Sequence, residues 1–305
     1  MGELTVQVKY EADLAKLPFG NILHKGLDHT RRGHTGIYVN YETNDWNYRS
    51  FLVWLQDHIP EYALTYSELA ALNPRNMASL NIKAARLVHD RDKKIVKKGE
   101  IGELVLHGLI RDVYGTEPLI TKVFYKSHPT ENVKGFDCVH VIFNDETQEI
   151  DSLWFGEAKF WTKTDGAINS AFKSVKGFLE AKKMQKEFLT VRNHLDDKNP
   201  AKQQAEKLLS EYTSLDEIKA KLCVPVMIAY ESEVTGKHSK VDEAFLEAIE
   251  AELQTNIDAF LNKFKLDEDL DVDIHVFFLP LHDKDKTVEM FKEHIDSLQG
   301  SKAIY

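Results

Sequence analysis

Apolar residues between positions 76 and 114 recur with the period of a helix. The stretch 100–114 places its apolar residues on one helical face and ends before Gly115, a residue that commonly terminates helices. A similar stripe precedes it at 76–90. The spacing therefore predicts two consecutive helices, over 76–90 and 100–114.

Three runs rich in β-branched and aromatic residues follow these helices. They cover 119–125, 136–143 and 152–161, and the polar segment NDETQE joins the second run to the third. Short apolar runs bounded by polar turn residues are typical of strands, and a short polar connection is typical of a hairpin. The pattern predicts three strands, the last two paired antiparallel.

The second half of the chain alternates between the two patterns. A proline-free apolar stripe predicts one long helix over 165–194, and two short helices lie within 201–222. Two apolar runs, CVPVMIAYE and DIHVFFLPL, predict strands separated by a helix over 241–264 and followed by a final helix. This order predicts an α/β fold with a mixed central sheet flanked by helices.

The first 75 residues are less regular. They carry short β-like pieces, LTVQVKY and TGIYVNY, among aromatic-rich segments. A boundary falls near Asn73–Pro74, because the residue before a proline is disfavoured in a helix. We therefore predict an N-terminal accessory region over 1–75 and one domain over 76–305. Because it lies outside the predicted core, the accessory region is the candidate surface for docking a partner.

Composition limits the compartment. Of the 305 residues, 43% are hydrophobic and 29% are charged, and neither a membrane-spanning apolar run nor an apolar signal core is present. We therefore expect a cytoplasmic protein that does not bind membranes. The two cysteines, Cys138 and Cys223, lie in apolar runs and are predicted to be buried, reduced thiols.

Charge is unevenly distributed along the chain. The formal net charge of -10 argues against indiscriminate binding of nucleic acid, because phosphates are contacted by Lys and Arg. The stretch 159–192 is nevertheless rich in lysine and includes Lys163, Lys173 and Lys176. Such a stretch is most often a solvated helix face. It is also the candidate surface for a phosphate backbone.

Three charged residues interrupt two of the predicted strands. Side chains alternate along a strand, so Glu157 and Lys159 share a face, and the predicted hairpin brings Asp137 to the level of Glu157. Burying charges is costly unless they pair with each other or with a bound cation. Two carboxylates suit Mg²⁺, and a neighbouring lysine can orient water or stabilise charge on phosphorus. The alternative is a structural salt bridge at a strand end.

The triplet Glu-x-Lys is a weak signal by itself, since it begins at Glu157, at Glu180 and at Glu217. The last two fall in charged helical segments, where such residues are ordinary surface groups. Only Glu157 lies in a predicted strand and follows an acid, Asp137, on a neighbouring strand. This setting is what makes the first triplet a candidate for chemistry.

The setting resembles the PD-(D/E)xK nuclease superfamily, whose core is a helix, a three-stranded meander, a second helix and a further strand. The matching residues are Asp137 in the sequence FD and the triplet EAK that runs from Glu157 to Lys159. Phe136 stands where the motif has its proline. The superfamily shares this core among restriction, recombination and repair enzymes, so the core does not fix the biological role.

The resemblance implies a role for each matching residue. Asp137, Glu157 and the carbonyl of Ala158 would hold Mg²⁺ or Mn²⁺, and Lys159 would position or activate the attacking water. An acid on the preceding helix often contributes as well, and Glu103 is the position implied here.

A closer resemblance covers most of the chain. The succession GELVLHGLIRD, VFYKS, KGFDCVHVIF, LWFGEAKFW and CVPVMIAYE is similar to the HamA family, the nuclease subunits of the Hachiman anti-phage defence system. That resemblance implies a nuclease that degrades DNA with little sequence preference. It also implies a heteromeric complex with a helicase of the HamB type, which holds the nuclease inactive until it senses aberrant or invading DNA.

The residues leave two other functions open. One is a non-catalytic module on a degenerate nuclease fold that regulates a helicase. The other is a nuclease that acts on RNA, because the hydrolytic residues would be similar for both nucleic acids.

Overall fold

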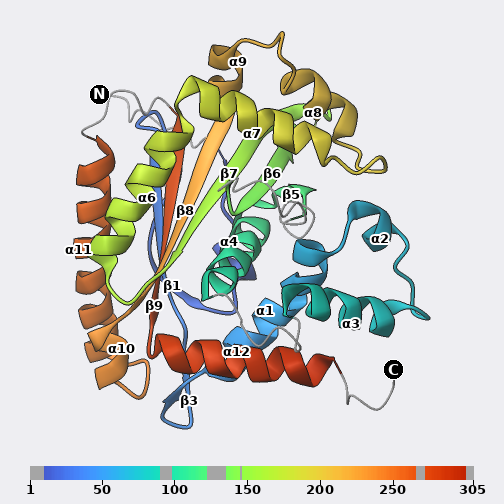
Figure 1. Cartoon of the computed structure of the whole chain (residues 1–305). Helices are drawn as coiled ribbons and strands as arrows, with labels where there is room; N and C mark the ends of the chain where they lie inside the picture. Colours follow the sequence, from blue (N-terminus) through green and yellow to red (C-terminus); the bar gives the residue numbers. More distant parts are fainter. Residues whose placement is uncertain (1–9, 90–97, 122–134, 145, 266–271, 300–305) are drawn as a thin grey trace.

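A mixed sheet forms the centre of the molecule. The computed structural model describes residues 10–89, 98–121, 135–144, 146–265 and 272–299. Its seven-stranded sheet has the order β1-β2-β9-β8-β7-β6-β5 (Figure 1). The strands β2, β9, β8 and β7 are parallel to one another, whereas β1, β6 and β5 pair antiparallel. The predicted fold class, a mixed α/β sheet flanked by helices, is confirmed.

The longest strand of the sheet is β7, and it passes the point where its partner β6 begins. The last residues of β7 therefore pair only with β8 in the described register. The strands of the main sheet are β1 (Gly20–Lys25), β2 (Arg32–Tyr38), β5 (Glu117–Ile120), β6 (Cys138–Phe143), β7 (Ile150–Phe160), β8 (Leu222–Glu231) and β9 (Asp273–Leu281). A separate small hairpin joins β3 (Tyr41–Glu42) to β4 (Asp45–Trp46).

Helices cover both faces of the sheet, and each face has its own apolar core. The first core is formed with the helices α1 (Tyr48–Ala63), α3 (Met77–Val88), α4 (Lys98–Tyr114) and α12 (Lys284–Leu298). The second is formed with α6 (Thr164–Phe178), α7 (Ala181–Asn193), α8 (Lys202–Leu208), α9 (Leu215–Ala220) and α11 (Glu243–Lys265). Shorter helical segments are η1 (Leu14–Lys16), α2 (Tyr66–Ala70) and α10 (Glu233–Lys237).

The two cores divide the side chains of β7 by alternation. Trp154 and Phe160 are buried on the side of α1 and α4, whereas Leu153 and Phe155 are buried on the side of α6 and α7. A strand with period-two side chains that is covered on both faces must be apolar on both faces. Polar residues in β7 are therefore exceptions that need partners.

Two glycines allow close packing around α4. A Cβ added at Gly156 of β7 would overlap Cys138 Sγ and would lie 2.7 Å from Leu106 Cδ2 of α4. A Cβ added at Gly108 of α4 would lie 2.7 Å from both His58 and Trp54 of α1. Such separations are shorter than van der Waals contact. Glycine at these positions lets α4 lie directly on β7 and lets α1 lie directly on α4.

The single helix predicted over 165–194 is wrong. The structure has α6 and α7 instead, and Glu180 between them has an extended backbone with φ -63° and ψ 124°. The break returns the second helix to the sheet, where Phe188 of α7 packs against Phe155 of β7 with 5.6 Å between the ring centroids. A straight helix would carry this apolar stripe into solvent. The stripes of the two halves therefore belong to two helices that share one core.

Residues assigned to the accessory region contribute to the central sheet. Strand β2 pairs in parallel with β9 near the end of the chain, and β1 extends the sheet beyond β2. Helix α1, which the sequence pattern did not predict, packs into the first core. The expected division at residue 75 thus does not correspond to an edge of the sheet. A role of residues 1–75 in partner docking stays a prediction.

Two of the predicted strands fall partly outside the described residues. The predicted strand LTVQVKY lies outside the described residues except for Tyr10, and the run over 119–125 is described only as far as 121.

Cys138 and Cys223 are buried free thiols, as predicted. No helix in the described part of the chain has the length and apolar character needed to cross a membrane.

Candidate active site

Three charged residues meet where β6 begins and β7 passes it; we call Asp137, Glu157 and Lys159 the strand-end cluster. Cys138 lies opposite Gly156 in the antiparallel register, so Asp137 falls at the level of Glu157. The backbone N–H of Asp137 donates to the Gly156 carbonyl at 2.8 Å. The predicted hairpin register is confirmed.

The side chain of Asp137 reaches across to β7. Its Oδ2 accepts a hydrogen bond of 2.8 Å from the backbone N–H of Ala158. Because β6 has not yet begun at this level, the Asp137 carboxylate takes the place of a strand partner for that N–H. One carboxylate is thereby fixed beside the backbone of the EAK triplet.

Glu157 and Lys159 are neighbours on one face of β7, as alternation predicts. Lys159 Nζ forms an ion pair with Glu157 Oε1, and the two side chains are only 13% and 11% exposed. Their cross-strand neighbours on β8 are Val226 and Ile228, which are fully buried and apolar. Breaking a buried ion pair by removing one partner costs about 3–5 kcal/mol. The ion pair is thus the compensation that lets both charges be buried.

Glu103 lies on α4, which packs against the Ala158 side of β7, whereas Glu157 and Lys159 point to the opposite side by alternation. Gly102 sits against Ala158, with 3.6 Å between its added Cβ and the Ala158 Cβ, which brings the following residue to the same end of β7. The hydroxyl of Tyr62 on α1 donates a 2.9 Å hydrogen bond to Glu103 Oε2. Sequence reasoning missed Tyr62, because its contact depends on how α1 packs against α4.

The electrostatics of Tyr62 link these acids. Burial raises the pKa of the Tyr62 phenol well above its usual range, and the negative charges of Glu103, Glu100 and Asp137 raise it further. The phenol therefore remains a hydrogen-bond donor at neutral pH. Asp137 and Glu103 both act on one side chain, so they belong to one electrostatic neighbourhood.

The three acids do not form a tight triad. Among the described residues, a group of three or more potential metal ligands within 4.8 Å of one another is found elsewhere, at His58, Glu61 and His107. Glu103 thus does not approach both Asp137 and Glu157 to that distance. The structure brings Asp137 and Glu157 to one level and holds Glu103 nearby through Tyr62.

A second residue that sequence reasoning missed is Glu187 of α7. It is 5% exposed, and its Oε1 accepts a 3.1 Å hydrogen bond from the backbone N–H of Phe136. The contact anchors the chain immediately before Asp137. Its sequence signal is weak, because it is a single glutamate on the apolar stripe of α7. The prediction of one helix over 165–194 did not place this stripe against the sheet.

The predicted phosphate-binding lysines follow β7 directly. Lys163 is the N-cap residue of α6, and Lys173 and Lys176 lie three residues apart in that helix; all three are exposed. Trp161, two residues after Lys159, is 41% exposed. The segment that leaves the strand-end cluster thus combines an exposed aromatic ring with positive charge.

The cluster has the donor set of a hard-cation site. Mg²⁺ and Mn²⁺ prefer oxygen ligands, and Mg²⁺ is usually held by one or two carboxylates. Asp137 and Glu157 provide such carboxylates at one level, and Ala158 is the backbone residue between Glu157 and Lys159. The ammonium of Lys159 on Glu157 marks where a cation neutralises this carboxylate. These residues fit the predicted metal, Mg²⁺ or Mn²⁺.

The comparisons with known proteins identify the family. No curated protein matches the chain. A family model described as HamA matches residues 18–295, which includes the whole strand-end cluster, Glu103 and the three lysines. Membership of this family associates the protein with anti-phage defence. Since the match spans nearly the entire sequence, the chain belongs to the HamA family.

Proposed function

We propose that this HamA-family chain is a metal-dependent endodeoxyribonuclease that cleaves DNA with little sequence specificity under the control of a helicase partner. The observation that carries the proposal is the buried Glu157–Lys159 pair at the level of Asp137. A salt bridge needs only two charges, and two buried charges rarely stabilise a fold more than apolar residues would. The additional carboxylate beside the pair favours a site for a cation and water.

The roles of the residues follow from their chemistry. Asp137, Glu157 and the Ala158 carbonyl would hold Mg²⁺ or Mn²⁺. When bound, such an ion supplies Lewis-acid activation of the phosphate and of water. Lys159 then turns from Glu157 to the reacting groups, where its ammonium orients the water and stabilises negative charge on the phosphate oxygens. The water oxygen bonds to phosphorus as the bond to the leaving oxygen breaks.

Glu103 would act beside this centre. Its carboxylate accepts a 2.9 Å hydrogen bond from the Tyr62 hydroxyl, which restricts its rotation. A carboxylate near the site can accept a proton from the attacking water, directly or through one further water. Tyr62 is thus a positioning residue for Glu103, and Glu187 is a positioning residue for Asp137.

The surface beyond the cluster suits a nucleic-acid backbone. Lys163, Lys173 and Lys176 would contact phosphates, and Trp161 offers a face on which a base can stack. The net charge of -10 keeps the affinity for DNA low away from this surface. A nuclease without sequence preference endangers its own cell, so low intrinsic affinity and inhibition by a HamB-like helicase in a heteromeric complex are expected together.

Cleavage of plasmid DNA and of RNA with Mg²⁺ or Mn²⁺ tests the proposal. The wild-type chain, alone and with its helicase, is compared with Glu157→Gln. The matched control is Glu180→Gln, which alters the same Glu-Ala-Lys triplet at a position that is exposed and paired with Lys183. We expect DNA cleavage by the wild type and by Glu180→Gln, and none by Glu157→Gln.

Each other outcome has a defined meaning. Equal cleavage by all three proteins would overturn the assignment of Glu157. Cleavage of RNA but not DNA would replace the substrate and keep the site. Absence of cleavage with and without the helicase, under conditions in which the complex forms, would favour the non-catalytic regulatory module.

A further inference from the structure

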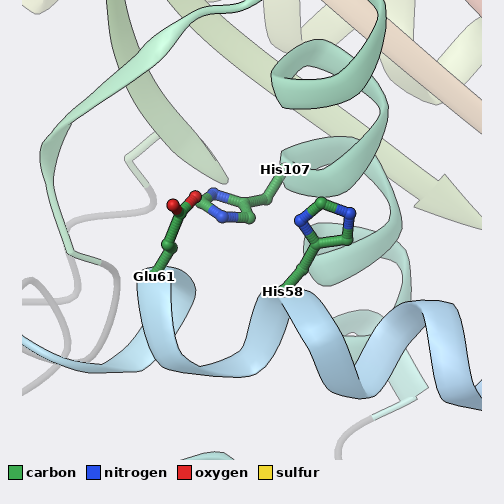
Figure 2. Close-up of side chains that lie close together, drawn as sticks. All are labelled: His58, Glu61 and His107. Atoms are coloured by element: carbon green, nitrogen blue, oxygen red, sulfur yellow. The ribbon is translucent and has the colours of Figure 1, made fainter. Parts of the chain in front are cut away.

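A second polar cluster lies between α1 and α4, and we call His58, Glu61 and His107 the interhelical cluster. His58 and Glu61 are one turn apart on α1, and His107 faces them from α4 (Figure 2). One potential ligand atom of each residue lies within 4.8 Å of the others. The close packing of the two helices at Gly108 produces this convergence.

One atom in this cluster is buried without a partner. Nε2 of His107 has no hydrogen-bond partner among the described residues, although the side chain is only 2% exposed. A buried polar atom without a partner is rare in folded proteins and points to a bound water or ion. The opposite ring nitrogen, Nδ1, is 3.0 Å from His140 Nε2.

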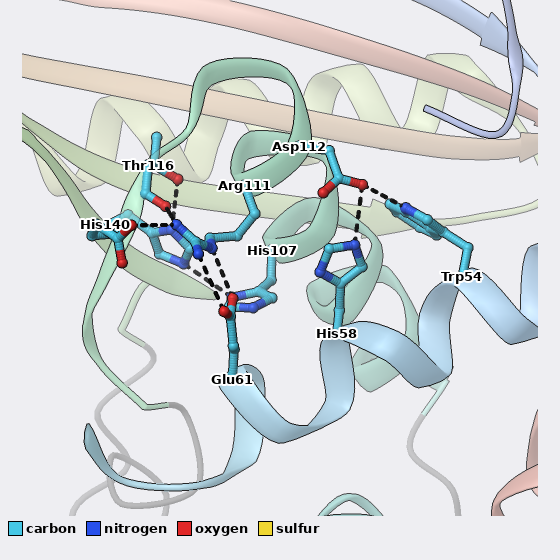
Figure 3. A network of polar contacts seen from close by, with 9 residues as sticks. Trp54, His58, Glu61, His107, Arg111, Asp112, Thr116 and His140 are labelled. Carbon is cyan, nitrogen blue, oxygen red and sulfur yellow. Dashed lines mark hydrogen bonds and ion pairs between the residues drawn. The ribbon is translucent and has the colours of Figure 1, made fainter. Parts of the chain in front are cut away.

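A chain of hydrogen bonds can fix the tautomer of His107. His140 Nδ1 is 2.8 Å from Thr116 Oγ1 (Figure 3). When His140 donates to Thr116, its Nε2 accepts from the Nδ1–H of His107. The Nε2 of His107 then carries a lone pair directed into the cluster. Metal-binding histidines characteristically donate their second ring N–H in this way.

The other two potential ligands, His58 and Glu61, are also held by polar contacts with neighbouring residues. His58 Nε2 is 3.2 Å from Asp112 Oδ2, which also accepts a 2.7 Å hydrogen bond from Trp54 Nε1. This leaves His58 Nδ1 as the ring atom available to an ion. Arg111 holds both oxygens of Glu61, with Nε at 2.7 Å and Nη2 at 3.1 Å. A carboxylate oxygen has more than one lone pair, so Glu61 can bind an ion while Arg111 stays in place.

The charge of the network has the sign that a cation needs. Glu61 and Glu117 contact Arg111, and Asp112 contacts His58. With the histidines neutral, three carboxylates and one guanidinium leave a formal charge of about -2, each group counting for one unit. A divalent ion would bring the total to zero. Glu61, whose side chain is 37% exposed, provides a route for the ion from solvent.

We propose that the interhelical cluster binds a divalent transition-metal ion, with Zn²⁺ as the best fit, through His58 Nδ1, His107 Nε2 and Glu61. Two imidazoles and one carboxylate are a known Zn²⁺ donor set, whereas Mg²⁺ prefers oxygen ligands alone. Tetrahedral binding would draw the donor atoms to about 3.3 Å from one another. The ion clamps α1 to α4 and thereby holds Tyr62 on Glu103.

The test measures metal content and does not depend on the nuclease proposal. Tag-free chain is stripped with a chelator and titrated with Zn²⁺ and with Co²⁺, whose visible absorption is strong in a four-coordinate nitrogen-containing site. We expect one Zn²⁺ per chain, the same binding by the double variant Asp137→Asn/Glu157→Gln, and loss of the Co²⁺ absorption in His58→Gln and His107→Gln. The control is His294→Gln, since His294 also contacts α1, through Gln56 at 2.7 Å.

A graded variant guards against misfolding. Asp112→Asn leaves all three ligands in place and weakens the contacts of this residue with His58 and Trp54, so it should weaken Zn²⁺ binding about 10- to 100-fold. His58→Gln should weaken it more, with an unchanged circular dichroism spectrum. The proposal is overturned if the wild type binds no Zn²⁺, or if His58→Gln and Asp112→Asn bind it as tightly as His294→Gln does.

Discussion

The strand-end cluster and the interhelical cluster both adjoin α4, yet they solve the problem of buried charge differently. In the first, two carboxylates lie beside a lysine of the same strand, which pairs with one of them. In the second, two imidazoles share a space with one carboxylate, which an arginine holds. The oxygen-rich cluster suits Mg²⁺ and hydrolysis, and the nitrogen-containing cluster suits Zn²⁺ and a structural clamp.

The two clusters are also connected to each other through α1. Glu61 and Tyr62 are adjacent on α1; one belongs to the interhelical cluster and the other donates to Glu103. The rings of Tyr62 and His107 are 5.7 Å apart at nearly right angles. A change in the spacing of α1 and α4 therefore reaches Glu103 through Tyr62. The clusters differ in chemistry but share a mechanical support.

The largest expected effect concerns the buried ion pair. The double variant Glu157→Gln/Lys159→Met replaces both charges with neutral side chains of similar size. Nuclease activity should fall by about 10²–10³-fold or more, because a group that stabilises the transition state is lost. Stability should change little, since replacing both members of a buried ion pair is often neutral. Plasmid cleavage and urea unfolding measure the two effects. Retained cleavage in the folded double variant contradicts a catalytic role.

Substitutions at the two close-packed glycines should affect the two clusters differently. Gly108→Ala should force α1 away from α4 and weaken Zn²⁺ binding, whereas Gly156→Ala should displace β7 and lower DNA cleavage more than Zn²⁺ binding. Each substitution should cost about 1–3 kcal/mol, the usual cost of overpacking. Co²⁺ titration, cleavage assays and urea unfolding of both variants provide the comparison. Identical profiles for the two alanines would show that the clusters do not depend on separate contacts.

His275, a buried histidine outside both clusters, should make the stability of the fold depend on pH. Burial lowers the pKa of His275 well below its usual range, and the nearby His24 and His34 lower it further. Because only the unfolded state takes up this proton as pH falls below about 6.5, stability should decrease toward acid by up to about 1.4 kcal/mol per pH unit from this group.

The variant His275→Gln should flatten this dependence, and the chelator-stripped wild type should keep it. Urea unfolding at pH 7.5 and 5.5 measures both. An equal acid loss in the variant and the wild type would assign the effect to other groups. Any additional acid sensitivity that appears only with Zn²⁺ present would then belong to the interhelical cluster.

The smallest effect is expected at the surface. Lys173→Gln/Lys176→Gln removes two exposed positive charges from α6. If each lysine neutralises one phosphate of duplex DNA, the slope of log affinity against log salt should become shallower by up to about 1.8. The matched control is Lys237→Gln/Lys240→Gln, two exposed lysines near α10. Equal salt slopes for the two double variants would exclude α6 as the DNA surface.

The sequence predicted the strand-end cluster because its geometry is local. Period-two alternation places Glu157 beside Lys159 on any strand, and one polar turn sets the hairpin register that brings Asp137 to the same level. The interhelical cluster had only the spacing of His58 and Glu61 as a signal. Its third ligand, His107, meets them through the packing of two helices, which no spacing along the chain encodes.

The same distinction explains where individual elements of the structure differ from the sequence prediction. Single strands and helices with strong periodicity were found, including β9 over the full predicted run. The break at Glu180 lets the apolar residues of both α6 and α7 pack into one core, and this requirement comes from tertiary packing. The incorporation of β2 into the sheet likewise depends on its distant partner β9. Long-range pairing of this kind is absent from any local pattern.

Diffraction from crystals grown with MnCl₂, with anomalous scattering used to locate the ion, tests the central claim most directly. We predict a manganese peak bound by Asp137, Glu157 and the Ala158 carbonyl, with the Lys159 ammonium moved off Glu157. A crystal grown with MnCl₂ that shows no peak there, and that keeps the Lys159–Glu157 ion pair intact, would contradict the assignment of the strand-end cluster as the hydrolytic centre.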